Sequence, residues 1–277
     1  MAERIRLRQI CLLTDRLEPL IDTLIAVFGL QVCHGKADLT RYGVPYEEPP
    51  AHSAAFFSKH GLASAQLPIG DTFLELVAPT RHDTPAGRYL NRRGGGGYMV
   101  ITEVEQTDPF LKRVEDHGVR LAGVVDYPTY HELQLDPRDI GASILSFSSH
   151  KQDEPFDGQW YPAGAHWRDR VQPGYRAIRS AELACADPAR TARQWAAVIG
   201  RDAIAVGDAL RIPLDDSEVR FVHDLEGRGD RLDAIYIEAD DFSTATRAAR
   251  EAGLVVSDGA IVIGGLKFRE VSSDGAN

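Results

Sequence analysis

The chain has 277 residues, of which 43% are hydrophobic and 26% are charged, a balance typical of globular proteins with sizeable apolar cores. Its formal net charge of −10, with no stripe of Lys and Arg to offset it, disfavours a nucleic-acid-binding role. The opening segment MAERIRLRQI is too charged for a signal peptide, and no apolar stretch approaches the ~18 residues of a membrane span. We therefore expect no membrane partner.

The three cysteines are Cys11, Cys33 and Cys185, and none of them forms a C-x-x-C pair. An odd count without paired spacing indicates a reducing compartment and no disulfide framework. Cys11 and Cys185 lie in apolar runs, where a small buried hydrophobe is the default interpretation. A cytoplasmic location follows by elimination.

One pattern recurs four times along the chain: an apolar strand, a polar turn, an amphipathic helix and several further strands. The strand–helix pairs occupy residues 5–30, 97–118, 175–200 and 232–253. In the first helix, apolar residues at spacings of three and four build one face, and Gly29 lies where a C-terminal cap is expected. Asp108 and Asp187 are predicted N-caps, each followed by a proline. The sequence therefore predicts an α+β fold of four βαβββ units.

The segment 151–174 breaks this periodicity. It contains three prolines, several glycines and the two tryptophans Trp160 and Trp167. We interpret it as the connection between an N-terminal domain (1–150) and a C-terminal domain (175–277), each built from two units. A flexible linker has no need of two tryptophans, so we expect the aromatic side chains to pack it onto one domain.

Three segments carry a resemblance to a known family: FLELVAP (73–79), GGGGYMVITEV (94–104) and LDPRDIGASILSF (135–147). Together with the fourfold repeat, they are similar to the vicinal oxygen chelate superfamily, which includes glyoxalases, extradiol dioxygenases and methylmalonyl-CoA epimerases. The resemblance covers nearly the whole chain and implies two glyoxalase-like domains, each with units paired into an incomplete barrel around a cavity. It also implies a small organic substrate and the possibility of a homodimer, because paired units in this superfamily often extend their pairing.

In that family a divalent metal is commonly held by four side chains from the first and last strands of paired units. In the N-terminal domain the resemblance places Gln9 and Glu75 at two of these positions, Tyr98 or Met99 at the third and Ser146 at the fourth. The last two are poor ligands for a hard cation. We therefore predict no metal cofactor, with Zn²⁺, Fe²⁺ or Mn²⁺ on Gln9 and Glu75 as the alternative.

In the C-terminal domain the corresponding positions fall at Ser180 or Glu182, near Arg220, at Asp233 or Ala234, and at about Arg269. Two arginines repel a cation, so no metal is expected in this half either. No H-x-H or H-E-x-x-H motif occurs elsewhere in the chain.

Glu75 is the sharpest catalytic candidate. Strand alternation places it on one face with Phe73 and Val77, and in a dry pocket its carboxyl group suits a general base. Gln9 and Tyr98 are candidates for stabilising a developing oxyanion. The alternative interpretations are an edge carboxylate, an ordinary strand hydrogen bond and a packed strand aromatic.

Four further residues are predicted to contact substrate. These are His52, His131, Arg138 and Ser146. The two histidines titrate near neutrality, although a lone histidine is more often an ordinary surface residue. Arg138 suits a carboxylate, but the D-P-R-D sequence around it is equally typical of a turn with an internal ion pair. No G-x-S-x-G motif surrounds Ser146, so serine-hydrolase chemistry is not indicated.

Three functions stay open. The leading hypothesis is an isomerase, epimerase or lyase that transfers a proton next to a carbonyl, lactone or acyl group, with Glu75 as base and no organic cofactor. The second is a metal-dependent lyase or ring-cleaving dioxygenase that uses Gln9 and Glu75. The third is a non-catalytic protein that sequesters a small hydrophobic or aromatic compound.

Overall fold

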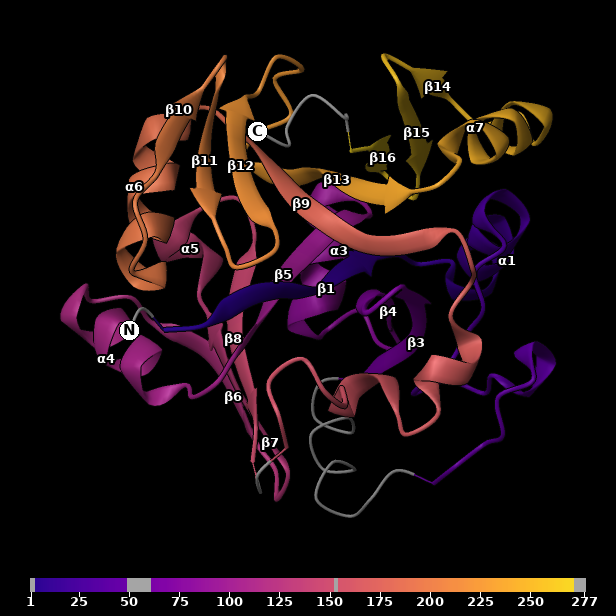
Figure 1. Ribbon diagram of the computed structural model, residues 1–277, viewed down its shortest axis with the longest axis horizontal. Helices are drawn as coiled ribbons and strands as arrows, with labels where there is room; N and C mark the ends of the chain where they lie inside the picture. The colour runs from indigo at the N-terminus through magenta and orange to yellow at the C-terminus, as the bar shows by residue number, and fades with distance from the viewer. Residues whose placement is uncertain (1–2, 49–60, 152–153, 272–277) are drawn as a thin grey trace. The chain divides into compact units, whose positions relative to one another are not determined.

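The structure is a computed structural model that describes residues 3–48, 61–151 and 154–271. Over these residues the predicted fourfold repeat is confirmed, because each segment runs strand, helix and three strands (Figure 1). The first segment consists of β1 (Ile5–Leu13), α1 (Leu17–Phe28), β2 (His34–Gly35), β3 (Leu62–Ile69) and β4 (Thr72–Pro79). The second consists of β5 (Gly96–Val104), α4 (Asp108–Asp116), β6 (Leu121–Asp126), β7 (Tyr130–Leu135) and β8 (Ile144–His150).

The second half repeats the order. The third segment consists of β9 (Tyr175–Cys185), α6 (Pro188–Ile199), β10 (Ile204–Val206), β11 (Ala209–Pro213) and β12 (Glu218–His223). The fourth consists of β13 (Arg231–Ala239), α7 (Phe242–Glu251), β14 (Val256–Ser257), β15 (Ala260–Ile263) and β16 (Leu266–Glu270). Outside the repeat lie α3 (Pro85–Arg93), α5 (Pro137–Ile140), η1 (Thr40–Tyr42), η2 (Tyr161–Ala163) and η3 (Trp167–Arg170).

The helix ends follow the predicted capping, with one difference. Gly29 closes α1 in the left-handed conformation at φ 67°, which glycine adopts without steric cost. Asp187 caps α6 by accepting the backbone N–H of Arg190 at 2.9 Å. Asp108 was expected as the cap of α4, but it is the first helical residue and Thr107 precedes it as the cap. The carboxylate of Asp108 still lies in the first turn, where the helix dipole favours negative charge.

The chain divides into two compact units. The first collects Met1–Ile10, Gly97–Tyr161 and Arg179–Ala234, and the second collects Cys11–Gly96, Pro162–Ile178 and Ile235–Asn277. These units gather residues by contact and interleave the repeats, so the sequential domains 1–150 and 175–277 stay a prediction. The connection 151–174 contributes to both units, and its tryptophans are divided between them: Trp160 is buried in the first and Trp167 in the second.

In the first unit, β8 lies between β5, to which it is parallel, and β7, to which it is antiparallel. The strands β9 and β12 form the second parallel pair, and β12 continues into β11 and β10. Each sheet buries an aromatic residue against its helix. Phe110 of α4 lies 4.6 Å from Phe147 of β8, and Trp195 of α6 lies 5.7 Å from Phe221 of β12, measured between ring centroids. These contacts define which strand faces the helices cover.

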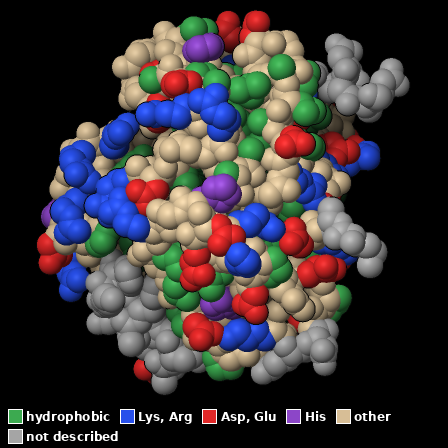
Figure 2. Space-filling model, turned by 90° about the vertical axis from the view of Figure 1, so that its left-hand side faces the viewer, with side chains coloured by type: hydrophobic (Ala, Val, Ile, Leu, Met, Phe, Trp, Pro, Cys, Tyr) green, Lys and Arg blue, Asp and Glu red, His purple; other side chains and the backbone are tan. Residues whose placement is uncertain are grey.

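In the second unit, β2, β3 and β4 pair antiparallel in that order, and β14, β15 and β16 do the same. Phe28 of α1 joins the core, with its ring centroid 5.3 Å from that of Phe268 and 6.0 Å from that of Phe242 in α7. No helix among the described residues is long and apolar enough to cross a bilayer. On the molecular face drawn in Figure 2, basic side chains lie beside acidic ones.

Candidate functional site

A row of polar side chains crosses the sheet of the second unit. His34 of β2 is the register partner of Gln66 of β3, and Gln66 is the partner of Glu75 of β4. Register partners on neighbouring strands project from the same face, so the three side chains lie in line; we call them the Glu75 row. The thiol of the buried Cys11 on β1 donates to Glu75 Oε2 across 3.0 Å. Glu75 itself is half-buried. Its carboxylate is therefore fixed by the thiol and still accessible from outside the core.

Lys36 adds a positive charge beside the row. Its backbone N–H donates to Ser64 O at 2.9 Å, which places Lys36 opposite a residue two positions before Gln66 on β3. Burial lowers the pKa of Lys36, while the negative charges of Glu75 and Glu47 act in the opposite direction. The pKa of His34 is also lowered, first by burial and then by the Lys36 charge, so the imidazole is held neutral. The row therefore combines one carboxylate, one amide, one neutral imidazole and one nearby ammonium group.

The surroundings of the row are apolar on one side. Phe73 precedes Glu75 on the same strand face and is fully buried, with its ring centroid 5.0 Å from that of Trp167 in the connection. Gly164 of the connection packs against His34, and a Cβ at this glycine would lie 2.9 Å from the imidazole Nδ1. The predicted strand face Phe73–Glu75–Val77 is thus confirmed as a mixed apolar and polar surface, covered in part by the connection.

Gln9 and Tyr98, the other predicted catalytic residues, belong to the first unit. The amide Oε1 of Gln9 accepts the indole N–H of Trp160 at 2.7 Å, and both side chains are buried. Tyr98 is half-buried on the face of β5 that also carries Thr102, the register partner of Phe147 beneath α4. Since Glu75 belongs to the second unit, joint action of the three residues stays a prediction.

The predicted substrate-contacting residues that the structure describes each have different contacts and different burial. His52 lies outside the described residues. The Nδ1 of His131 lies 2.6 Å from the hydroxyl of Thr107. Arg138 has a side chain that is 74% exposed and donates through Nε to Asp136 at 3.0 Å, which is the internal ion pair that the D-P-R-D turn predicts. Ser146 is fully buried on the face of β8 opposite Phe147.

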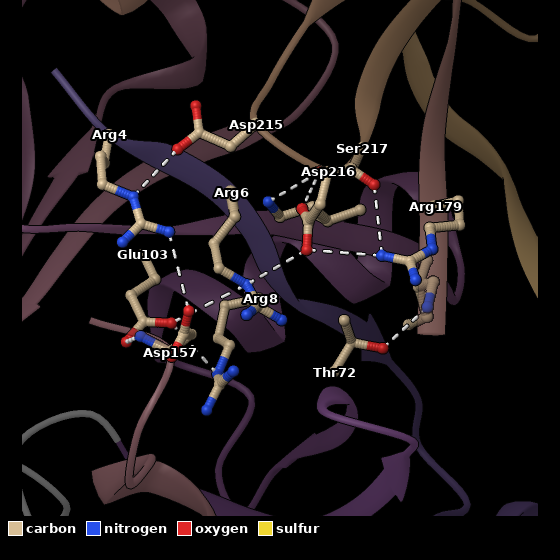
Figure 3. Close-up of polar contacts among 12 residues, drawn as sticks. Arg4, Arg6, Arg8, Thr72, Glu103, Asp157, Arg179, Asp215, Asp216 and Ser217 are labelled. Atoms are coloured by element: carbon tan, nitrogen blue, oxygen red, sulfur yellow. Dashed lines mark hydrogen bonds and ion pairs between the residues drawn. The ribbon is translucent and has the colours of Figure 1, made fainter. Parts of the chain in front are cut away.

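A network of charged side chains surrounds Arg8 and Glu103 (Figure 3). Arg8 and Glu103 are 0% and 1% exposed, and the Arg8 Nε lies 3.4 Å from Glu103 Oε2. Arg8 also donates to Gly158 O at 2.8 Å, and Glu103 accepts the backbone N–H of Asp157 at 3.2 Å. Arg6 lies between Glu103 and Asp216, at 4.0 and 3.7 Å. The connection therefore binds this network through its backbone.

The donor set does not fit a resident divalent metal. Among the residues that the structure describes, no group of three or more His, Cys, Asp or Glu side chains is placed to hold one. Gln9 Oε1 is occupied by the Trp160 indole, and Glu75 by the Cys11 thiol. In the third segment, Arg220 Nε lies 3.4 Å from Glu182 Oε2, so an internal cation already faces that carboxylate.

Sequence reasoning missed most of the Glu75 row. Alternation predicts Glu75 as a site residue, but the sequence assigns neither Gln66, His34 and Lys36 nor the predicted buried Cys11 to the same site. They lie on or beside other strands, whose register no local pattern fixes. A usable signal was present in the strand LASAQLPI, where Gln66 interrupts an otherwise small and apolar run. It is 1% exposed, and an amide that deeply buried calls for a polar partner.

Comparison with known proteins supports the fold. No protein-family model and no curated protein matches the chain. A hypothetical protein from Staphylococcus aureus is similar over 96% of this chain and 99% of its own, with a TM-score of 0.64 and 13% identity. A substituted 4-hydroxymandelate synthase from Streptomyces coelicolor covers 91% of this chain and 76% of its own, also with a TM-score of 0.64 and 13% identity. A methylmalonyl-CoA epimerase from the same organism covers 53% of this chain and 98% of its own, with a TM-score of 0.42 and 19% identity.

Over nearly the whole chain the fold is similar to that of these two proteins with a TM-score of 0.64, which confirms the predicted α+β fold class of four βαβββ units. At this level of identity the likeness concerns the fold and leaves the reaction to the residues of this chain.

Proposed function

We propose that this chain is an enzyme that transfers a proton next to the carbonyl of a small organic substrate, with Glu75 as the general base. The observation that carries the proposal is the Glu75 row, in which a half-buried carboxylate is held by the Cys11 thiol at 3.0 Å and flanked by the buried amide of Gln66. A base must be fixed within reach of its proton and stay accessible. Glu75 meets both conditions.

The charges around the row suit an enolate-forming step. When Glu75 accepts a proton from the carbon next to a carbonyl, the electron pair of the broken C–H bond moves onto the carbonyl oxygen. The carboxylate becomes neutral as the substrate becomes anionic, so Lys36 retains a negative partner throughout. In this proposal the side-chain amide of Gln66, the register partner of Glu75, donates to the new oxyanion. Return of the proton to the same or another carbon gives epimerisation or isomerisation, and loss of a β-substituent gives elimination.

The test is exchange of a substrate C–H proton with solvent deuterium, followed by NMR. It requires no knowledge of the final product and is run on a panel of lactones, thioesters and hydroxy ketones. Glu75→Gln should reduce exchange by at least about 100-fold, the lower range of general-base contributions. Glu105→Gln is the matched control, because that carboxylate is exposed. Full exchange by a folded Glu75→Gln variant would refute the assignment.

The prediction that Gln9 and Tyr98 stabilise an oxyanion is tested by the same measurement. Gln9→Leu and Tyr98→Phe are expected to slow exchange less than Glu75→Gln does, because neither residue carries the proton. The finer expectations, a cytoplasmic location and a homodimer, are proposed with them. None of the three cysteines is disulfide bonded, which supports a reducing compartment. Light scattering on the purified protein tests whether it forms a dimer.

Two other results would favour the alternative functions. Stoichiometric divalent metal in the purified protein would favour the metal-dependent lyase or dioxygenase. Tight binding of an aromatic compound without deuterium exchange, unchanged in Glu75→Gln, would favour a sequestering protein.

A further inference from the structure

Lys36 is a half-buried amine beside the Glu75 row that the proposed reaction uses only as a nearby charge. It follows β2, two positions after His34, and its backbone N–H continues the ladder between β2 and β3 by donating to Ser64 O at 2.9 Å. Residues two apart on an extended strand project from the same face. Ser64 is in turn the register partner of Val77, which shares its strand face with Glu75. Lys36 therefore belongs to the row of side chains next to the Glu75 row.

The charges of this region act on one another. Burial lowers the pKa of Lys36, and the negative charge of Glu75 opposes that effect. Burial also lowers the pKa of His34, and the positive charge of Lys36 adds to the effect. Such influences require short distances, because solvent screens charges that lie far apart. An amine, an imidazole and a carboxylate are thus gathered on one sheet face.

Lys36 differs in this respect from an ordinary surface lysine. Its burial outweighs the charges of Glu75 and Glu47, so a larger fraction of the side chain is free amine at neutral pH than in an exposed lysine. Lys112 provides the contrast, because its side chain is 74% exposed and its ammonium lies 2.7 Å from Asp116. A free amine adds readily to the carbon of a carbonyl group.

We propose that Lys36 condenses with the carbonyl group of an aldehyde or ketone substrate, so that Glu75 removes a proton next to an iminium ion. The proposal rests on the proposed function of Glu75 and narrows its substrate class. Lactones and thioesters are excluded from this route, because on attack by an amine they release an alkoxide or a thiolate and form an amide.

Two of the three protons of the Lys36 ammonium leave with the carbonyl oxygen as water. The new C=N bond retains the third proton and the positive charge, and the neutral imidazole of His34 transfers protons from nitrogen to oxygen. When Glu75 accepts the proton of the neighbouring carbon, the electron pair of the C–H bond moves onto the iminium nitrogen and gives a neutral enamine. The nitrogen thus replaces the carbonyl oxygen as the electron acceptor. Return of the proton and addition of water reverse the sequence and release the product.

The test traps the iminium with sodium cyanoborohydride, which reduces it to a stable secondary amine. With hydroxyacetone as the carbonyl probe, peptide mass mapping of the wild-type protein should find the adduct on Lys36. It should form there at least about 10-fold faster than on Lys112, although Lys112 is the more exposed amine. Equal labelling of the two lysines would overturn the proposal. This comparison needs no substitution, so it does not depend on whether a variant folds.

Two variants then connect the adduct to the reaction. Lys36→Arg keeps the positive charge but cannot condense, so it should lose both the adduct at this position and the exchange of hydroxyacetone C–H protons with solvent deuterium. Lys112→Arg is the matched control and should retain both. Full exchange in a folded Lys36→Arg variant would overturn the role of Lys36 as the condensing amine.

The variant Glu75→Gln separates this proposal from the proposed function. It should still form the Lys36 adduct while losing exchange, because condensation precedes removal of the proton. Absence of the adduct in the wild type would overturn the role of Lys36, and the proposed function of Glu75 would stand wherever exchange persisted. An adduct on Lys36 with full exchange in Glu75→Gln would support the condensation and overturn Glu75 as the base.

Discussion

The indole N–H of Trp160 donates to Gln9 Oε1 across 2.7 Å, so the connection occupies the oxygen of an amide that the sequence predicts to contact substrate. The same ring packs against its neighbours, with centroid distances of 5.5 Å to His150 and 5.7 Å to Tyr130. Trp160 therefore completes the core of the first unit, and the connection is a structural element of that unit.

Replacing Trp160 with Phe should destabilise the protein by about 1–3 kcal/mol, because the aromatic packing is largely retained while a buried amide loses its donor. Urea denaturation measures the free energy of unfolding. A double-mutant cycle with Gln9→Leu isolates the bond, since the cost of Trp160→Phe should shrink once the acceptor is absent. An unchanged cost in the Gln9→Leu background would show that only packing was lost.

Breaking the Arg8–Glu103 ion pair should lower the free energy of unfolding more than Trp160→Phe does. Glu103→Gln leaves the guanidinium of a fully buried Arg8 without its carboxylate, and breaking a buried ion pair from one side costs about 3–5 kcal/mol. The exposed pair Lys112–Asp116 is the control, and Asp116→Asn should have little effect because solvent screens that pair. Comparable losses in the two variants would mean that Arg8 is solvated when its partner is removed.

His150 predicts how stability depends on pH. Its pKa in the folded protein is about 4, below the ordinary value of 6.5, so the unfolded chain binds a proton more readily between these values. Stability from this group is therefore fully present above pH 6.5 and is lost as the pH falls toward 4, by at most about 3 kcal/mol. Glu103 acts in the opposite sense, because burial raises its pKa despite Arg8 and Arg6.

The variant His150→Gln separates the two contributions, because glutamine accepts the Tyr161 N–H without titrating. Its unfolding free energy should fall less between pH 6.5 and 4 than that of the wild type, with denaturant midpoints measured at each pH. Parallel curves for the two proteins would assign the acid sensitivity to other groups.

The thiol of Cys11 predicts a pH effect on catalysis. A hydrogen bond to the ionised form of Glu75 stabilises that form. In Cys11→Ala the carboxylate should therefore protonate at a higher pH, and the acid limb of the rate profile for deuterium exchange should move upward. Cys11→Ser retains a donor and should leave the limb close to its wild-type position. A lower rate without a moved limb would limit Cys11 to packing.

The fold was predictable because its signals are local. Helical periodicity, the glycine after α1 and the Asp-Pro start of α6 lie within a few residues of one another. The site depends on pairings that no local pattern encodes. His34 and Gln66 become neighbours through strand register across 32 positions, and Arg8, a residue type usually exposed, is buried because Glu103 and the backbone of Gly158 surround it. Glu75 was found because its position in FLELVAP is visible in a single strand.

A final prediction concerns the tight turn between β3 and β4, which holds Gly70 ahead of the strand that carries Glu75. A Cβ at Gly70 would lie 1.5 Å from the backbone oxygen of Arg176, and the residue has φ +57°. Gly207, in the equivalent Gly-Asp turn between β10 and β11, has a similar φ of +59° but nothing within 4 Å of its Cβ position. Gly207→Ala should therefore report backbone strain alone, about 1 kcal/mol. Gly70→Ala must also displace backbone, so its free energy of unfolding should fall by clearly more than that of Gly207→Ala. Equal losses in the two variants would mean that the turn adjusts freely and that the contact with Arg176 does not hold β4 in place.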